Sequence, residues 1–273
     1  MPLPDLDRMA VDDVALSVDR IASEMHRQLG NIAAPVPVDQ IALRLGIDEI
    51  RERPLREFEA VLVTDPERSS GSILLNSRSS PYRRRYSLAH ELGHFLCGWH
   101  KQTSRKGFVC NKRDMAIPSG NDVHVRQETE ANQFAIELLA PKRLISRYLN
   151  RLPDLEHVLA MHAALEISKT AAARRYVNSH RERLAVIFGY EGCYQYADRG
   201  IGFPYIGLHK GDPLPPLPNV GRDSSISDVE EADPLDWPGL QRAKVLAIQV
   251  MRQENGHSII LLQIEADDPN DDD

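Results

Sequence analysis

Residues 84–96 read RRYSLAHELGHFL and predict a helix that carries two histidines one turn apart. His90 and His94 stand at i and i+4, so both imidazoles lie on one side of the helix and can reach a single ion at about 2.0 to 2.1 Å. Glu91 is rotated by roughly 100° from His90 about the helix axis, which places its carboxylate beside the ion, within reach of a bound water. This HExxH pattern predicts a catalytic zinc site.

A catalytic zinc has three protein ligands and one open position, so the pattern needs a third ligand. Residues 127–140, QETEANQFAIELLA, predict a helix that ends at Pro141. Its spacing places one carboxylate on a stripe of mostly small side chains, formed by Glu128, Ala131, Asn132, Ala135 and Leu139. We expect Glu128 to be the third ligand, and Asn132 to hydrogen-bond a ligand histidine or the Glu carboxylate.

His100 is the main rival for the third position, because it follows His90 by ten residues, as in the pattern HExxHxxGxxH. That pattern places Gly seven residues after the first His, where this chain has Cys97. Glu130 is a weaker rival, since it is rotated by about 200° from Glu128 and only one of the two can face the ion.

Three further side chains have weaker claims on this site. His124 and Cys110 lie in the predicted loop 100–123 and could approach the metal, although such residues are more often surface or structural ones. Tyr86 or His124 could donate to an oxyanion, and Tyr86 is predicted to pack in the core.

The pattern on both sides of this region predicts an α+β organisation. We expect helices over 12–29, 38–46 and 81–98, a hairpin formed by EAVLVT (59–64) and GSILLN (71–76), and two helices within 154–180 with Ser168 as a cap. Strand-like segments follow at 183–190, 243–252 and 258–265. Residues 211–239 are rich in Pro, Gly, Asp and Ser, which predicts a long irregular and partly disordered connection.

Composition narrows the class of protein further. The formal charge of −7 over 273 residues disfavours bulk electrostatic binding to nucleic acid or anionic lipid. Three cysteines far apart argue against a disulfide framework and suit a reducing compartment. No apolar stretch is long enough to cross a bilayer, so we expect a cytoplasmic protein without a membrane partner.

Three motifs together resemble the ImmA/IrrE family of metallopeptidases. They are RRYSLAHELGHFL (84–96), ETEANQFAIELLAP (128–141) and the weaker EISKTAAARRYV (166–177), and the resemblance covers roughly residues 15–180. One departure is LLAP, where Met often precedes Pro in the family.

The resemblance implies a zincin-like fold with His90 and His94 as zinc ligands, Glu91 as catalytic base and Glu128 as third ligand. It also implies a protein substrate, namely a helix-turn-helix repressor whose cleavage induces stress-response or mobile-element genes. The expected organisation is a mostly helical peptidase domain with a small β-sheet (1–150), a helix-turn-helix-like segment (151–182) and a β-rich C-terminal domain with a Pro-rich insertion and an acidic tail (183–273).

Another class of protein competes with the peptidase. Residues 154–180 could bind DNA through Arg174 and Arg175, with a zinc site that only stabilises the fold or acts as a sensor. Two arginines on an acidic protein are usually solvated, which weakens this alternative. A third reading, a partner-binding module with a degraded peptidase site, is weakened because all four expected site residues are present.

Overall fold

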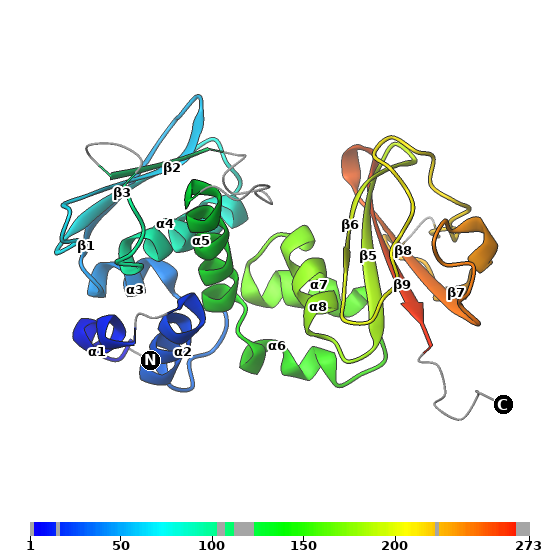
Figure 1. The fold of residues 1–273 in the computed structure, drawn as a ribbon, viewed down its shortest axis with the longest axis horizontal. Coiled ribbons are helices and arrows are strands. Elements are labelled where there is room, and N and C mark those ends of the chain that lie inside the picture. Colours follow the sequence, from blue (N-terminus) through cyan, green and yellow to red (C-terminus); the bar gives the residue numbers. More distant parts are fainter. Residues whose placement is uncertain (1–2, 15–16, 103–106, 112–122, 222–223, 266–273) are drawn as a thin grey trace. The chain divides into compact units, whose positions relative to one another are not determined.

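The computed structural model describes residues 3–14, 17–102, 107–111, 123–221 and 224–265 (Figure 1). The acidic tail, residues 267–273, and part of the predicted loop 100–123 lie outside these described residues. The chain divides into two compact units. The first unit comprises Met1–Pro141 and Ala164–Ile167, and the second comprises Lys142–Ala163 and Ser168–Asp273.

Two helices of the first unit begin at serine residues that cap them. Ser17 accepts a hydrogen bond from the Arg20 amide, so the predicted helix 12–29 begins later than expected. Ser80 caps the helix that carries the HExxH motif, and Pro81 occupies its first turn, where no amide donor is needed. The five helices are α1 (Arg8–Asp13), α2 (Val18–Leu29), α3 (Val38–Arg44), α4 (Pro81–Leu96) and α5 (Val123–Leu139).

A four-stranded sheet completes the first unit, with the order β1-β3-β2-β4. The strands are β1 (Ile47–Arg53), β2 (Phe58–Thr64), β3 (Gly71–Asn76) and β4 (Gly107–Asn111). The predicted hairpin is confirmed as the antiparallel pair β2 and β3. Two strands were not predicted: β1 runs parallel to β3, and β4 pairs antiparallel with β2 at the edge of the sheet, inside the segment predicted as a loop.

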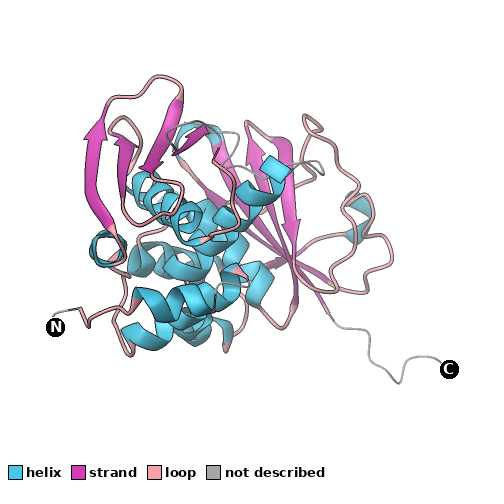
Figure 2. Ribbon diagram, turned by 60° about the vertical axis from the view of Figure 1, so that its left-hand side comes forward, coloured by secondary structure: helices cyan, strands magenta, loops and turns pink. Residues whose placement is uncertain are grey.

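Helix α4 is buried between other elements of the first unit. It packs against β2 and β3 of the sheet and also against α5. In Figure 2 the strands of this sheet, at the upper left, lie on one side of the helices beneath them. Contact with α5 is close at Gly93, because a Cβ atom there would stand 2.9 Å from Cδ1 of Phe134. The HExxH helix is therefore held on two sides.

The second unit combines three helices with a five-stranded antiparallel sheet of order β6-β5-β9-β8-β7. Its helices are α6 (Lys142–Leu149), α7 (Leu155–Leu165) and α8 (Lys169–Ser179), and Ser168 caps α8 as predicted. Its strands are β5 (Arg183–Tyr190), β6 (Cys193–Arg199), β7 (Glu230–Glu231), β8 (Leu246–Arg252) and β9 (His257–Ile264), with short 3-10 turns at Pro234–Asp236 and Glu254–Gly256. The α+β class is confirmed, while α6, β6 and β7 are additions to the prediction.

The Pro-rich connection is irregular, but the expectation of partial disorder is wrong for its described residues. Trp237 is fully buried and belongs to the same hydrophobic cluster as Ile248 and Leu262 of the sheet. Burial of a tryptophan side chain contributes a few kcal/mol of stability, which holds the segment in place without regular secondary structure. Residues 222–223 lie outside the described part of the chain.

Two findings bear on the expected partners. Arg174, one of the two arginines that motivated a DNA-binding surface, forms an ion pair with Asp198 of β6. Within the described residues, no helix is long and apolar enough to cross a membrane.

Candidate metal centre

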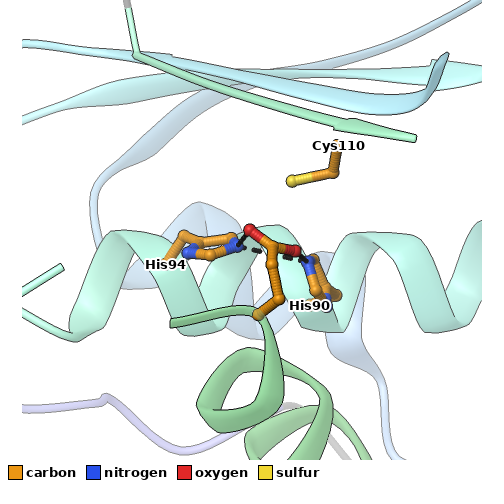
Figure 3. A group of neighbouring side chains, drawn as sticks. His90, His94 and Cys110 are labelled. Carbon is orange, nitrogen blue, oxygen red and sulfur yellow. Dashed lines mark hydrogen bonds and ion pairs between the residues drawn. The ribbon is translucent and has the colours of Figure 1, made fainter. Parts of the chain in front are cut away.

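Helices α4 and α5 bring the three predicted ligands together in the interior of the first unit. His90 and His94 are fully buried and Glu128 is 1% exposed. The two imidazole Nε2 atoms lie 3.2 Å apart. Each faces a different oxygen of Glu128, at 3.2 Å for His90 and 3.3 Å for His94. Figure 3 shows the two histidines on successive turns of α4.

The second nitrogen of His90 is held by a hydrogen bond from α5. Nδ1 lies 3.0 Å from Oδ1 of Asn132, which also accepts a hydrogen bond of 2.9 Å from the Tyr86 hydroxyl. Because Oδ1 can only accept, Nδ1 carries the proton in the neutral His90 ring, and Nε2 then carries a lone pair. Asn132 thus has the supporting position predicted for it, and Tyr86 does more than pack in the core, because its hydroxyl fixes the amide of Asn132.

Two consecutive hydrogen bonds orient His94 in the same way. Nδ1 of His94 lies 2.9 Å from Nδ1 of His100, and Nε2 of His100 lies 2.9 Å from the Glu130 carboxylate. The carboxylate requires a proton on His100 Nε2, so Nδ1 of a neutral His100 accepts from His94 Nδ1. Nε2 of His94 therefore also presents a lone pair. His100 and Glu130, the two rivals for the third ligand position, are placed behind His94 instead.

The segment that carries His100 is anchored at both ends. The buried guanidinium of Arg68 donates to the carbonyl oxygens of Cys97 and His100. The Gln127 side chain of α5 accepts from the Lys101 amide and donates to the Lys101 carbonyl, both at 2.9 Å. These contacts fix His100 against His94.

The resulting cluster has a set of groups that could hold a cation. Two lone pairs and two carboxylate oxygens face one another in the interior, and neither Glu128 oxygen accepts a hydrogen bond from a described residue. An uncompensated buried carboxylate costs several kcal/mol, which an ion in the middle of the cluster would offset. Four ligands of a tetrahedral zinc at about 2.0 to 2.1 Å stand roughly 3.3 to 3.4 Å apart, close to the 3.2 to 3.3 Å that separates the two Nε2 atoms from each other and from the Glu128 oxygens. The residues fit zinc, although their role as ligands stays a prediction.

Burial also keeps His94, a predicted ligand, uncharged. Loss of solvent lowers the pKa of His94 to about 3, against an ordinary value of 6.5. Burial likewise lowers the pKa of His100. Both rings are neutral at pH 7, the state that a metal ligand must have.

Glu91 and His124 flank the cluster without belonging to it. Glu91 is fully buried on α4, and its carboxylate is absent from the group of converging ligand atoms that the described residues form. This placement is compatible with a base beside the ion. His124 is 42% exposed, and its Nδ1 lies 3.6 Å from Glu128, at the margin of the centre.

Cys110 is the fourth member of the converging group, although the sequence predicted it to lie in a loop with only a weak claim on the metal. The four ligand atoms of His90, His94, Glu128 and Cys110 lie within 4.8 Å of one another, and all four residues are buried. The available signal was the alternation in GFVC, which places Phe108 and Cys110 on one face of a strand. Phe108 stacks on His94, with ring centroids 4.6 Å apart and an interplanar angle of 18°.

Comparison with known proteins places the region around this centre in a peptidase context. Residues 43–177 match the family model of the M78 peptidases, described as the IrrE N-terminal-like domain. The comparison with curated proteins gave no match. Among solved structures, a Mycobacterium tuberculosis transcriptional regulator is similar at a TM-score of 0.55 and 13% sequence identity, covering 94% of this chain and 79% of that one. At that identity the likeness concerns the fold alone.

Proposed function

Residues 43–177 form an IrrE N-terminal-like domain of the M78 peptidase family, and from this premise we propose that the chain is a zinc-dependent endopeptidase. The observation that carries the proposal is the convergence of His90, His94 and Glu128. Their two Nε2 lone pairs and carboxylate oxygens meet at 3.2 to 3.3 Å, while the Nδ1 atoms are engaged elsewhere. This arrangement is the one that a divalent ion needs.

The chemistry divides between the ion and the chain. A zinc ion in such a site polarises a carbonyl group and lowers the pKa of water to about 7. Glu91 accepts the proton of the attacking water and returns it to the leaving amine. Asn132 and His100 keep the two imidazoles in the correct tautomer. His124, at the exposed margin, is the candidate donor to the developing oxyanion.

The proposed substrate is a helix-turn-helix transcriptional repressor, cleaved in the cytoplasm to induce stress-response or mobile-element genes. This part rests on the family resemblance of the HELGH and ETEANQFA motifs. Direct binding of DNA is less well supported, because Arg174 is already paired with Asp198. A reducing compartment agrees with Cys97, Cys110 and Cys193, none of which forms a disulfide.

The proposal is tested with purified protein and the repressor encoded beside it. Glu91→Gln keeps the size of the side chain but removes the base, so it should bind zinc as the wild type does and cleave about 10² to 10⁴ times more slowly. Glu156→Gln, on the exposed surface of α7, is the matched control and should cleave normally. Undiminished cleavage by Glu91→Gln would overturn the assignment of the base. A repressor that stays intact both with zinc-loaded wild type and with a zinc-loaded Cys110→Ala variant would overturn the substrate.

A further inference from the structure

Strand β4 lies over the metal centre and aims two side chains at it. Phe108 and Cys110 are two residues apart in the strand, so both side chains lie on the same face. Phe108 stacks on the His94 ring, and Cys110 is 1% exposed. In Figure 3 the Cys110 thiol points from the strand toward the space between His90 and His94. The pairing of Cys110 with Ala60 of β2 fixes this register.

The position of the sulfur suits a metal ligand. Zinc binds thiolate at about 2.3 Å and imidazole at about 2.0 to 2.1 Å, so sulfur and nitrogen stand about 3.6 Å apart in a tetrahedron. The ligand atoms of the group lie within 4.8 Å of one another, which exceeds that value by no more than about 1.2 Å (4.8 − 3.6). We expect rotation of the Cys110 side chain to close this difference when the ion binds.

Charge and burial point in the same direction. The two imidazoles are neutral, whereas the Glu128 carboxylate and a Cys110 thiolate each carry one negative charge. Together they balance a divalent cation, which suits a centre whose protein ligands are all buried. Four protein ligands also fill the tetrahedron, as in structural zinc sites, and leave no position for water.

We propose that Cys110 is the fourth protein ligand of the zinc, and that the peptidase is latent while its sulfur is bound. The inference rests on the proposed function, because it requires an ion between His90, His94 and Glu128. Activation is a ligand exchange in which the thiolate leaves, takes up one proton from solvent and is replaced by one water molecule. No bond is oxidised or reduced.

The decisive experiment uses cobalt as a spectroscopic probe in the full chain. Metal-stripped wild type, Cys110→Ala and Cys193→Ala are loaded with Co²⁺, and their absorption spectra are recorded. Wild type and Cys193→Ala should show an intense near-ultraviolet sulfur-to-cobalt charge-transfer band, and Cys110→Ala should lack it while still binding one equivalent. Cys193 of β6 is the matched control, since it also forms no disulfide and belongs to the second unit.

The possible outcomes distinguish the existence of the metal centre from the ligation by Cys110. Failure of wild type to bind cobalt would overturn both the metal centre and the role of Cys110. Binding with the same spectrum in wild type and Cys110→Ala would overturn only the ligation by Cys110. Zinc X-ray absorption of the wild type gives the same answer without a variant, and it should find one sulfur at about 2.3 Å.

The latent state is tested by the rate at which zinc-loaded variants cleave the repressor. If the closed centre predominates by 1.4 kcal/mol or more, zinc-loaded Cys110→Ala should cleave the repressor about tenfold faster than wild type, or more. Cys193→Ala should cleave at the wild-type rate. An equal or lower rate for a folded, zinc-loaded Cys110→Ala would overturn the latent state, even if the cobalt spectra establish the ligand.

Discussion

The two imidazoles of the centre are oriented by different partners. His90 donates to Asn132, a neutral amide held by Tyr86, whereas His94 donates to His100, which in turn faces the carboxylate of Glu130. The hydrogen bonds from His94 through His100 end at the negative charge of Glu130, which increases the basicity of His94 as a potential metal ligand. Glu130 also accepts from the Trp99 indole at 2.6 Å, which fixes the carboxylate.

We therefore expect Glu130→Ala to weaken zinc affinity by about 10- to 100-fold, because His94 loses the end of the chain that orients it. Glu130→Gln keeps a neutral acceptor for His100 and should recover most of that affinity. Arg126→Gln removes only the exposed partner of Glu130, which lies 2.8 Å away, and should have little effect. Competition with a chromophoric chelator measures the zinc affinity of all three variants. Equal affinities for wild type and Glu130→Ala would contradict the proposal that Glu130 orients His94 through His100.

His124 makes a second residue-scale prediction, since it reaches Glu128 from the exposed margin of the site. Loss of one oxyanion donor lowers kcat by roughly 10² to 10³, and we expect His124→Ala to show such a fall with its zinc content unchanged. Steady-state cleavage combined with metal analysis makes the distinction. A loss of zinc in parallel with activity would instead place His124 among the groups that hold the ion.

At the scale of elements, the site depends on how closely α5 approaches α4. The buried Ala131 and Ala135 keep the facing side of α5 small, and Gly93 of α4 leaves room for Phe134. The sequence predicted the alanine stripe and the glutamate on it. It did not predict the role of Gly93, because a glycine inside HExxH has no signature of its own.

Gly93→Ala should separate the two helices, because the new Cβ would meet Phe134 at 2.9 Å. Overpacking of this kind costs about 1 to 3 kcal/mol, offset by up to about 1 kcal/mol of helix propensity. We expect lower stability in urea and weaker zinc binding. Gly98→Ala is the control, since the nearest atom to its Cβ would be Arg68 Nη1 at 3.8 Å. Unchanged zinc affinity in Gly93→Ala would show that the spacing of the helices does not limit the site.

The elements that the sequence missed share a physical cause. Strand β1 reads IDEIRER and is largely exposed, and β6 reads CYQYADR at the outer edge of its sheet, so neither shows a clean apolar alternation. Strand β4 is short and acquires its conformation by pairing with β2, which is a tertiary contact. Because β4 was predicted as loop, Cys110 could not be placed over His90 and His94. The proposed ligands His90, His94 and Glu128 could be predicted from the sequence, because the spacings that indicate them lie within α4 and within α5.

At the scale of the whole molecule, buried neutral histidines occur in both compact units. Burial lowers the pKa of His94 and His100 in the first unit, and of His157 and His180 in the second. Each of these rings binds a proton more readily in the unfolded chain, where its pKa is near the ordinary 6.5. The native state therefore loses stability as pH falls below that value.

We expect the metal-free protein to be most stable above about pH 6.5 and to weaken progressively toward pH 3, the folded-state pKa of His94. Each unit of separation between folded and unfolded pKa is worth at most about 1.4 kcal/mol. Urea denaturation from pH 7.5 to 4, followed by far-ultraviolet circular dichroism, measures this. A stability that is flat or rises over this range would contradict the buried, neutral state of these histidines.

The most direct test of the central claim is the titration of metal-stripped protein with zinc by calorimetry. The account predicts one ion per chain for wild type and for Glu91→Gln, and a loss of this binding in His90→Ala, His94→Ala and Glu128→Ala. If Glu128→Ala bound zinc as tightly as the wild type, the assignment of Glu128 as a ligand would be contradicted. If folded Glu91→Gln failed to bind zinc, the assignment of Glu91 as the base beside the ion would be contradicted.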